Sequence, residues 1–137
     1  MRIPIAKPDI GKDEVEAVLE TMRSGWVTQG QRVEEFERTF ADYCGAKYGV
    51  ATSSGTAALH IALASIGIKS GDEVVTTPLS CVATANPIIY ANGKPVFADV
   101  DPKTLNIDSS AVRRKITKKT RAILPVHLFG HPVDMDP

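Results

Sequence analysis

Residues 52–63, Thr-Ser-Ser-Gly-Thr-Ala-Ala-Leu-His-Ile-Ala-Leu, join a strand pattern to a helix pattern and so decide the fold. The short apolar run 48–51 precedes them. After Thr56, apolar side chains recur at the spacing of one helix face, and Gly67 is placed to end that helix. We therefore predict a strand over residues 48–52 and a helix over residues 55–66.

The turn at Ser54, Gly55 and Thr56 is predicted to bind an anion such as phosphate. The first turn of a helix has unpaired N–H groups and the positive end of the helix dipole. Gly55 allows close approach, and the two hydroxyls add hydrogen bonds. The alternative is that Ser54 only caps a buried helix. The stretch matches no motif for nucleoside triphosphates or dinucleotides.

The composition is that of one globular unit: 137 residues, 43% apolar and 23% charged, with no net charge. The most basic stretch, residues 113–119, has no interleaved aromatic residues and is predicted to be an exposed helix end, not a nucleic-acid site. No apolar run approaches membrane-spanning length, and the start has no apolar signal region. Cys44 and Cys81 are isolated, which favours free thiols. We expect a cytoplasmic protein without membrane or nucleic-acid partners.

The order of elements predicts an α/β fold. Two amphipathic patterns, 12–23 and 31–44, form a helical N-terminal segment, residues 1–45, and the α/β core follows over residues 46–137. In the core, strands and helices alternate, which predicts a three-layer sandwich with a largely parallel sheet. The predicted strands are 48–52, 73–77, 95–98 and 121–126, and the predicted helices are 55–66, 81–91 and 108–116.

Ligands of such sheets bind beyond the carboxyl ends of the strands. A metal pair at His127 and His131 is not expected, because no further His or Cys cluster supports it and Pro132 breaks any helix that would align the two imidazoles. Asp99 and Asp101 are either paired acid/base carboxylates or turn residues, and the Asp101-Pro102 step favours the turn. The predicted rim carries Ser53, Ser54, Gly55, Thr56, Ser80, Cys81, Asp99, Asp101 and His127.

An ordered set of motifs makes the chain resemble a known family. They are Gly25-Trp26-Val27-Thr28-Gln29-Gly30, Phe36-Glu37, Ser54-Gly55-Thr56-Ala57-Ala58-Leu59, Gly71-Asp72-Glu73-Val74, Ala83-Thr84-Ala85-Asn86, Pro95-Val96-Phe97-Ala98-Asp99-Val100-Asp101 and Val126-His127-Leu128-Phe129-Gly130. This order resembles the DegT/DnrJ/EryC1/StrS sugar aminotransferases, which use pyridoxal 5'-phosphate (PLP) on a fold-type I scaffold. The resemblance implies the N-terminal part of the large domain of such a PLP-dependent transferase.

The resemblance also implies a cofactor site. Gly55 and Thr56 would bind the PLP phosphate, and Cys81 stands where the family usually places an aromatic ring on the pyridine. A sulfur atom packs on a ring but covers less of it, and the alternative is that Cys81 is a small core residue. The implied cofactor-binding set is Ser54, Gly55, Thr56, Ser80, Cys81 and His127.

A substrate site is implied at residues 25–28, which would border the sugar-nucleotide pocket at the interface of a homodimer. The alternative for Trp26 is a simple core anchor. The residues concerned are Gly25, Trp26, Val27 and Thr28.

The reaction implied is transfer of an amino group from an amino acid, expected to be glutamate, to a keto-sugar nucleotide for cell-surface polysaccharide or antibiotic sugars. It needs a lysine that links to PLP and an acidic group at the pyridine nitrogen. The resemblance places both beyond residue 137, so no catalytic residue is expected here and this chain alone is expected to be inactive. The alternatives are a PLP-dependent dehydratase of the same family, or a non-catalytic fragment or anion-binding module.

Overall fold

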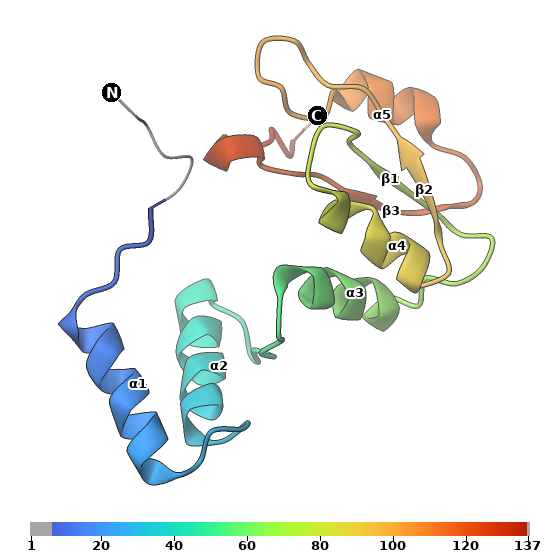
Figure 1. Cartoon of the computed structure of the whole chain (residues 1–137). Helices are drawn as coiled ribbons and strands as arrows, with labels where there is room; N and C mark the ends of the chain where they lie inside the picture. Colours follow the sequence, from blue (N-terminus) through green and yellow to red (C-terminus); the bar gives the residue numbers. More distant parts are fainter. Residues whose placement is uncertain (1–6, 137) are drawn as a thin grey trace. The chain divides into compact units, whose positions relative to one another are not determined.

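The computed structural model of the protein describes residues 7–136, which belong to two compact units, Met1–Ala51 and Thr52–Pro137. Figure 1 shows the helices of the first unit in blue and cyan, and the α/β second unit in green to red. None of the described helices is long and apolar enough to cross a membrane.

The N-terminal unit contains two helices, as predicted. They are α1 (Lys12–Ser24) and α2 (Gln31–Cys44). Gly25 and Gly45, with φ of 71° and 65°, end them in the left-handed conformation that glycine adopts without a steric penalty. Among the described residues of this unit, Ala41 is the only buried hydrophobic one.

The strand predicted over residues 48–52 is wrong, because that segment is irregular in the structure. The backbone N–H of Ala51 donates to the Glu37 carboxylate at 2.7 Å instead of to a neighbouring strand. Tyr48 and Val50 are exposed. An apolar run becomes a strand only where another strand pairs with it, and none of the described strands does so here.

The second unit is built on a three-stranded parallel sheet of order β2-β1-β3. The central strand β1 (Glu73–Thr76) is buried throughout, and it lies between β2 (Lys94–Phe97) and β3 (Thr120–Leu124). Val75 pairs with Val96 on one side and with Ile123 on the other. The three strands are parallel, as predicted, although β3 ends two residues before the predicted boundary.

Three helices and two 3-10 turns precede, connect and follow the strands. They are α3 (Gly55–Ser65), η1 (Val82–Thr84), α4 (Asn86–Tyr90), α5 (Ser109–Lys115) and η2 (Leu128–Gly130). The continuous helix predicted over residues 81–91 is wrong, because η1 and α4 are separate elements. Pro87 has no N–H and disfavours helical geometry in the residue before it, so it is tolerated only in the first turn of α4.

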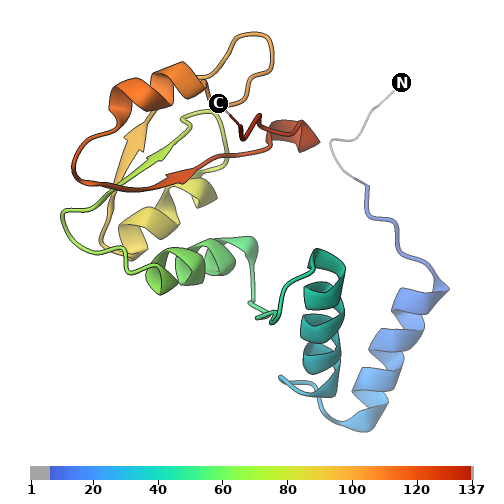
Figure 2. The same cartoon turned by 180° about the vertical axis from the view of Figure 1, so that it is seen from behind.

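Two hydrophobic clusters cover opposite faces of the sheet. Val74 packs with Leu63 of α3 and Ile88 of α4. Its neighbour Val75 packs on the other face with Val112 of α5. Figures 1 and 2 show α3 and α4 on one side of the strands and α5 on the other. Because successive strand residues point to opposite faces, this gives the predicted three-layer sandwich.

Candidate functional site

The N-terminal end of α3 has the geometry predicted for an anion site. Ser54 is the N-cap, with an extended backbone, and its Oγ accepts a hydrogen bond from the Ala57 N–H at 3.2 Å. The Ser54 carbonyl accepts from the Ala58 N–H at 3.0 Å. Among the described residues, the N–H groups of Gly55 and Thr56 have no acceptor. The cap and the anion site are therefore compatible, because two N–H groups remain for a ligand.

Space is open above this turn. A Cβ added at Gly55 would have no other atom within 4 Å, so nothing in the described structure requires glycine there. Thr56 is half-buried, and within residues 7–136 its hydroxyl makes no hydrogen bond. A phosphate oxygen fits such a site, because the backbone, a hydroxyl and the helix dipole all favour an anion.

The loop after β1 contributes Ser80 and Cys81. The Ser80 hydroxyl lies 2.9 Å from the Thr84 hydroxyl, which fixes it beside η1. Cys81 is the residue before η1, and its thiol is free and exposed. The alternative of Cys81 as a small core residue is therefore wrong.

The loop after β3 carries His127. Its Nδ1 accepts a hydrogen bond from the Val133 N–H at 2.9 Å, and its side chain is exposed. Phe129 has φ 51° and Gly130 has φ 81°. A left-handed non-glycine residue costs on the order of 1–3 kcal/mol unless its surroundings hold it. This loop is therefore fixed by contacts outside its own backbone.

Those contacts come from Asn106, which sequence reasoning missed. Its side chain is buried, its Oδ1 accepts from the Leu128 N–H at 3.1 Å, and its Nδ2 donates to the carbonyls of His131 and Pro132 at 3.0 Å each. An amide between the apolar residues Leu105 and Ile107 was the signal available. A buried amide must find partners, and here they lie in another loop.

Asp99 and Asp101 stabilise the turn after β2, as the sequence favoured. The Asp101 carboxylate accepts from the Thr104 N–H at 3.0 Å and the Lys103 N–H at 2.7 Å, and these bonds lower its pKa below the usual value. Asp99 accepts from the Val100 N–H at 2.9 Å. Both carboxylates accept hydrogen bonds from local backbone N–H groups, as turn residues do.

The cofactor candidates gather at one end of the second unit. In both Figure 1 and Figure 2, the start of α3, η1 and η2 lie toward the end where the parallel strands terminate. The turn at residues 54–56, the loop with Ser80 and Cys81 and the loop with His127 thus lie toward the edge of the sheet at which proteins of this class bind ligands.

The substrate candidates lie in the first unit, in the connection between α1 and α2. Trp26 donates from Nε1 to the Gln29 carbonyl at 2.8 Å and is 65% exposed, so its interpretation as a core anchor is wrong. A Cβ at Gly30 would overlap the indole, so Gly30 provides the space for it. Gly25 gives the left-handed turn that precedes Trp26, while Val27 and Thr28 follow it in the same exposed connection.

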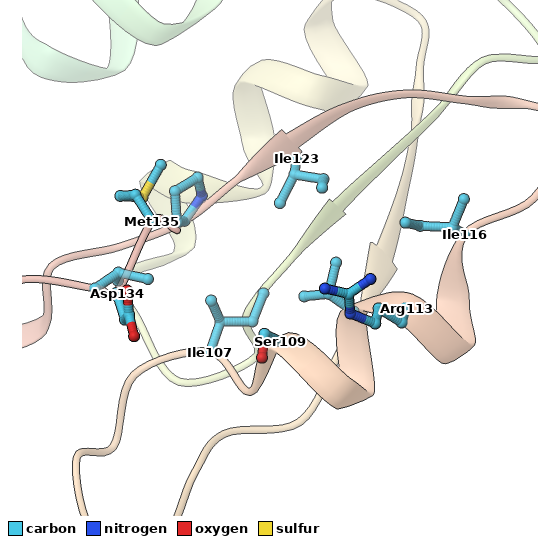
Figure 3. Close-up of a pocket in the computed structure, with 10 residues that line it drawn as sticks. Ile107, Ser109, Arg113, Ile116, Ile123, Asp134 and Met135 are labelled. Carbon is cyan, nitrogen blue, oxygen red and sulfur yellow. The ribbon is translucent and has the colours of Figure 1, made fainter. Parts of the chain in front are cut away.

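A pocket of ≈ 210 Å³ lies elsewhere, beside α5 and β3. Figure 3 shows Ile116 and Ile123 on its apolar side, with Arg113, Asp134 and Met135 nearby. It contains none of the predicted site residues. Since α5 covers the sheet face opposite to α3, this pocket is separate from the candidate cofactor site.

The family model described as the DegT/DnrJ/EryC1/StrS aminotransferase family matches residues 8–137. The chain belongs to this family. The resemblance predicted from the motifs is thus confirmed, and members of the family provide the comparisons for the site.

Among its relatives, the spore coat polysaccharide biosynthesis protein SpsC of Bacillus subtilis is 48% identical over 134 residues, which are 98% of this chain and 34% of SpsC. GDP-perosamine synthase of Caulobacter vibrioides is 45% identical over 137 residues, or 99% of this chain and 37% of that enzyme. The chain thus spans about a third of the length of the curated relatives it matches.

The fold agrees with that of a solved structure. The putative sugar aminotransferase Spr1654 from Streptococcus pneumoniae, in its PMP-form, superposes with a TM-score of 0.91 at 34% identity, over 97% of this chain and 33% of that one. A PLP-form of the same protein is also known. The predicted α/β scaffold of a PLP-dependent transferase is therefore confirmed.

Proposed function

We propose that this chain forms the cofactor-phosphate-binding part of a PLP-dependent sugar aminotransferase. The observation that carries the proposal is the start of α3, where the N–H groups of Gly55 and Thr56 have no acceptor and the space above Gly55 is open. The PLP- and PMP-forms of Spr1654 support the choice of cofactor.

Different residues of the chain are proposed to contact different parts of PLP. Gly55 and Thr56 would hold the phosphate together with the Ser54 and Ser80 hydroxyls, and Cys81 would contact the pyridine ring. His127 lies at the rim as a polar contact. When bound, PLP supplies the electron sink through which an amino group is exchanged. The lysine and the acid that the chemistry also needs are proposed to come from outside these 137 residues.

For the substrates we propose an amino acid donor, glutamate, and a keto-sugar nucleotide acceptor. The names of SpsC and GDP-perosamine synthase, a polysaccharide protein and a nucleotide-sugar enzyme, support this class. Residues 25–28 would border the sugar nucleotide, where the exposed Trp26 indole offers a flat apolar surface. The two free thiols fit a reducing compartment, the cytoplasm.

A second copy of the chain is the proposed partner of the N-terminal unit. Large apolar side chains of α1 and α2 are exposed, including Met22, Phe36 and Phe40. Exposed apolar surface of this kind marks an interface. We expect a homodimer by analytical ultracentrifugation, and Phe36→Asp should shift the protein toward monomer. A monomer at all concentrations would contradict this part of the proposal.

The phosphate site is tested by titrating inorganic phosphate and PLP into the 15N-labelled chain. The amide signals of Gly55 and Thr56 should shift first. Thr56→Val, which keeps the side-chain shape but removes the hydroxyl, should weaken binding roughly tenfold or more, since a hydrogen bond to a charged group is lost. Ser65→Ala, at the other end of α3, is the matched control and should bind like the wild type. Unchanged Gly55 and Thr56 signals in the folded chain would overturn the proposal.

The reaction is tested with the complete product of the reading frame. Supplied with glutamate and a keto-sugar nucleotide, it should form 2-oxoglutarate and the amino sugar in equal amounts. Loss of water from the sugar without transfer of nitrogen would identify a dehydratase instead. The chain of 137 residues alone should give neither product.

A further inference from the structure

We propose that Asn106 is a positioning residue that holds the loop 127–133 and so presents the His127 Nε2–H as a hydrogen-bond donor to an oxygen atom of the bound ligand. The ligand contact rests on the proposed function, whereas the hold on the loop does not. Asn106 lies outside the motifs that carry the family resemblance.

The amide of Asn106 is used almost completely. Both protons of Nδ2 go to successive carbonyls, of His131 and Pro132, and Oδ1 accepts the Leu128 N–H. Only one orientation of the amide satisfies these three partners, because two are acceptors and one is a donor. Since Asn106 as a whole residue is only 5% exposed, water does not compete for these bonds.

The backbone of Asn106 is itself fixed. Asp101 accepts the N–H groups of Lys103 and Thr104, and the Thr104 hydroxyl accepts the Asn106 N–H at 3.3 Å. The Asn106 carbonyl accepts the Asp101 N–H at 2.9 Å. The turn after β2 is thus a rigid support from which one amide reaches the loop after β3.

The consequence for His127 follows from its Nδ1. This atom accepts the Val133 N–H, so a neutral imidazole carries its proton on Nε2. Within residues 7–136, Nε2 has no partner, and the side chain is exposed. His127 directly precedes η2, which lies toward the end of the unit where α3 begins (Figure 1). A group in this state donates to an acceptor such as a carboxylate, phenolate or phosphate oxygen.

The test uses NMR of the 137-residue chain without ligand. In the wild type, a coupling through the hydrogen bond should join the Val133 backbone nitrogen to His127 Nδ1. In Asn106→Ala, amide exchange of Leu128 should accelerate because its acceptor is gone. Exchange of Val133, whose acceptor is His127, should accelerate as well, by roughly tenfold or more, because the loop is released. A purely local role for Asn106 would leave Val133 protected, and that result would overturn the proposal.

Two further variants keep the test decisive. Asn106→Asp retains an acceptor for the Leu128 N–H but loses both donors, so the Leu128 amide should stay protected from exchange while the Val133 amide does not. This variant replaces Asn106→Ala in the test if the alanine variant changes the amide signals of β1, which would indicate a disturbed fold. Asn86→Ala is the control, because among the described residues the Asn86 side chain makes no hydrogen bond. Absence of the coupling in the wild type would also overturn the proposal.

Titration with PLP then distinguishes the hold of Asn106 on the loop from the contact of His127 with the ligand. If Gly55, Thr56 and the His127 ring all shift, and the His127 shift is lost in Asn106→Asp, the positioning role is supported. If Gly55 and Thr56 shift while His127 does not, the phosphate site stands and the ligand contact of His127 is wrong. If none shifts but the coupling and exchange results hold, the proposed function fails and the hold on the loop remains.

Discussion

The two units differ in the sequence patterns of their helices and in what those helices bury: α1 and α2 are amphipathic, whereas α3 is apolar on all sides. In the second unit, β1 is covered on both faces, and Val74, Val75 and Ile88 have no exposed surface. In the first unit, the apolar stripes of α1 and α2 remain largely exposed, and Ala41 is the one buried hydrophobic residue among those described. The hydrophobic periodicity of a sequence therefore predicts a helix, whereas burial of its apolar face depends on a packing partner that the periodicity does not identify.

This difference bears on function. The candidate phosphate site belongs to the unit with its own core, so its geometry is supported by packing within residues 52–136. The substrate candidates around Trp26 belong to the unit without one. We infer that the phosphate site is formed by the chain itself, whereas the sugar site needs a further surface.

The largest effect is expected from Ile88→Ala. Ile88 of α4 is fully buried against Val74 of β1, and removing its side chain should lower the free energy of unfolding by about 2–5 kcal/mol. Phe36→Ala is the counterpart in the first unit. Since Phe36 is 57% exposed, this change should cost less than about 1 kcal/mol in dilute monomer.

Urea unfolding measures both variants. Trp26 is the only tryptophan of the chain and reports on the first unit, while circular dichroism reports on the whole. A Phe36→Ala cost that grows with protein concentration would show that a second copy covers this face. Equal costs for the two variants in monomer would contradict the contrast between the units.

Next in size is Gly93→Ala. A Cβ there would lie 2.7 Å from Cγ2 of Ile68 and 3.2 Å from Cγ2 of Ile88, so the change overfills the core by about 1–3 kcal/mol. Gly55→Ala is the matched control, because its Cβ meets nothing within 4 Å. It should leave the urea midpoint nearly unchanged while weakening phosphate binding. A similar loss of stability in both variants would mean that the space above Gly55 is not open.

The sequence predicted the features that local pattern controls. Both helices of the first unit and the parallel strands β1 to β3 follow from periodicity and from glycines such as Gly25 and Gly45, while α3 follows from its Ser54 cap and its apolar run. The capped turn at the start of α3 was predictable because the apolar run, the turn and the helix start are contiguous in the chain. The separation of η1 from α4 could also have been predicted from the sequence, because Pro87 disfavours helical geometry in the residue before it.

The structural features that the sequence did not predict depend on contacts with residues distant in the chain. Residues 48–52 have the composition of a strand, but a strand exists only through its neighbour. The Asn106 contacts join residues 22 to 26 positions apart, and no local pattern indicates which loop a buried amide will reach. The exposure of Trp26 and Cys81 likewise depends on what packs against them.

A smaller effect, with a pH dependence, is expected at Glu73 where β1 begins. The Thr117 hydroxyl at 2.7 Å and then the Lys94 ammonium at 3.3 Å hold its pKa below the ordinary value of 4.5. The stability this gives is fully present above pH 4.5 and is lost as the pH falls through the lowered pKa. Glu73→Gln should therefore be less stable than the wild type at neutral pH and lose less on acidification.

Urea midpoints from neutral to acid pH measure this difference. Glu34→Gln removes the same charge from α2, where among the described residues the Glu34 carboxylate has no ion pair or hydrogen bond. The gap between the two variants then isolates the contacts of Glu73. Parallel curves for both would show that these contacts do not persist in solution.

The smallest effect is expected at Arg32, which pairs with Glu20 of α1 and with Glu35 of α2. All three side chains are about half exposed, so Arg32→Ala should cost only about 0.2–1 kcal/mol, and the cost should fall in about 1 M salt. Arg38→Ala is the control, because Arg38 has no ion pair among the described residues. Trp26 fluorescence during urea unfolding gives the readout. A loss of stability well above 1 kcal/mol that salt does not reduce would contradict this expectation. It would mean that the polar contacts of Arg32 make a large contribution to holding α1 against α2.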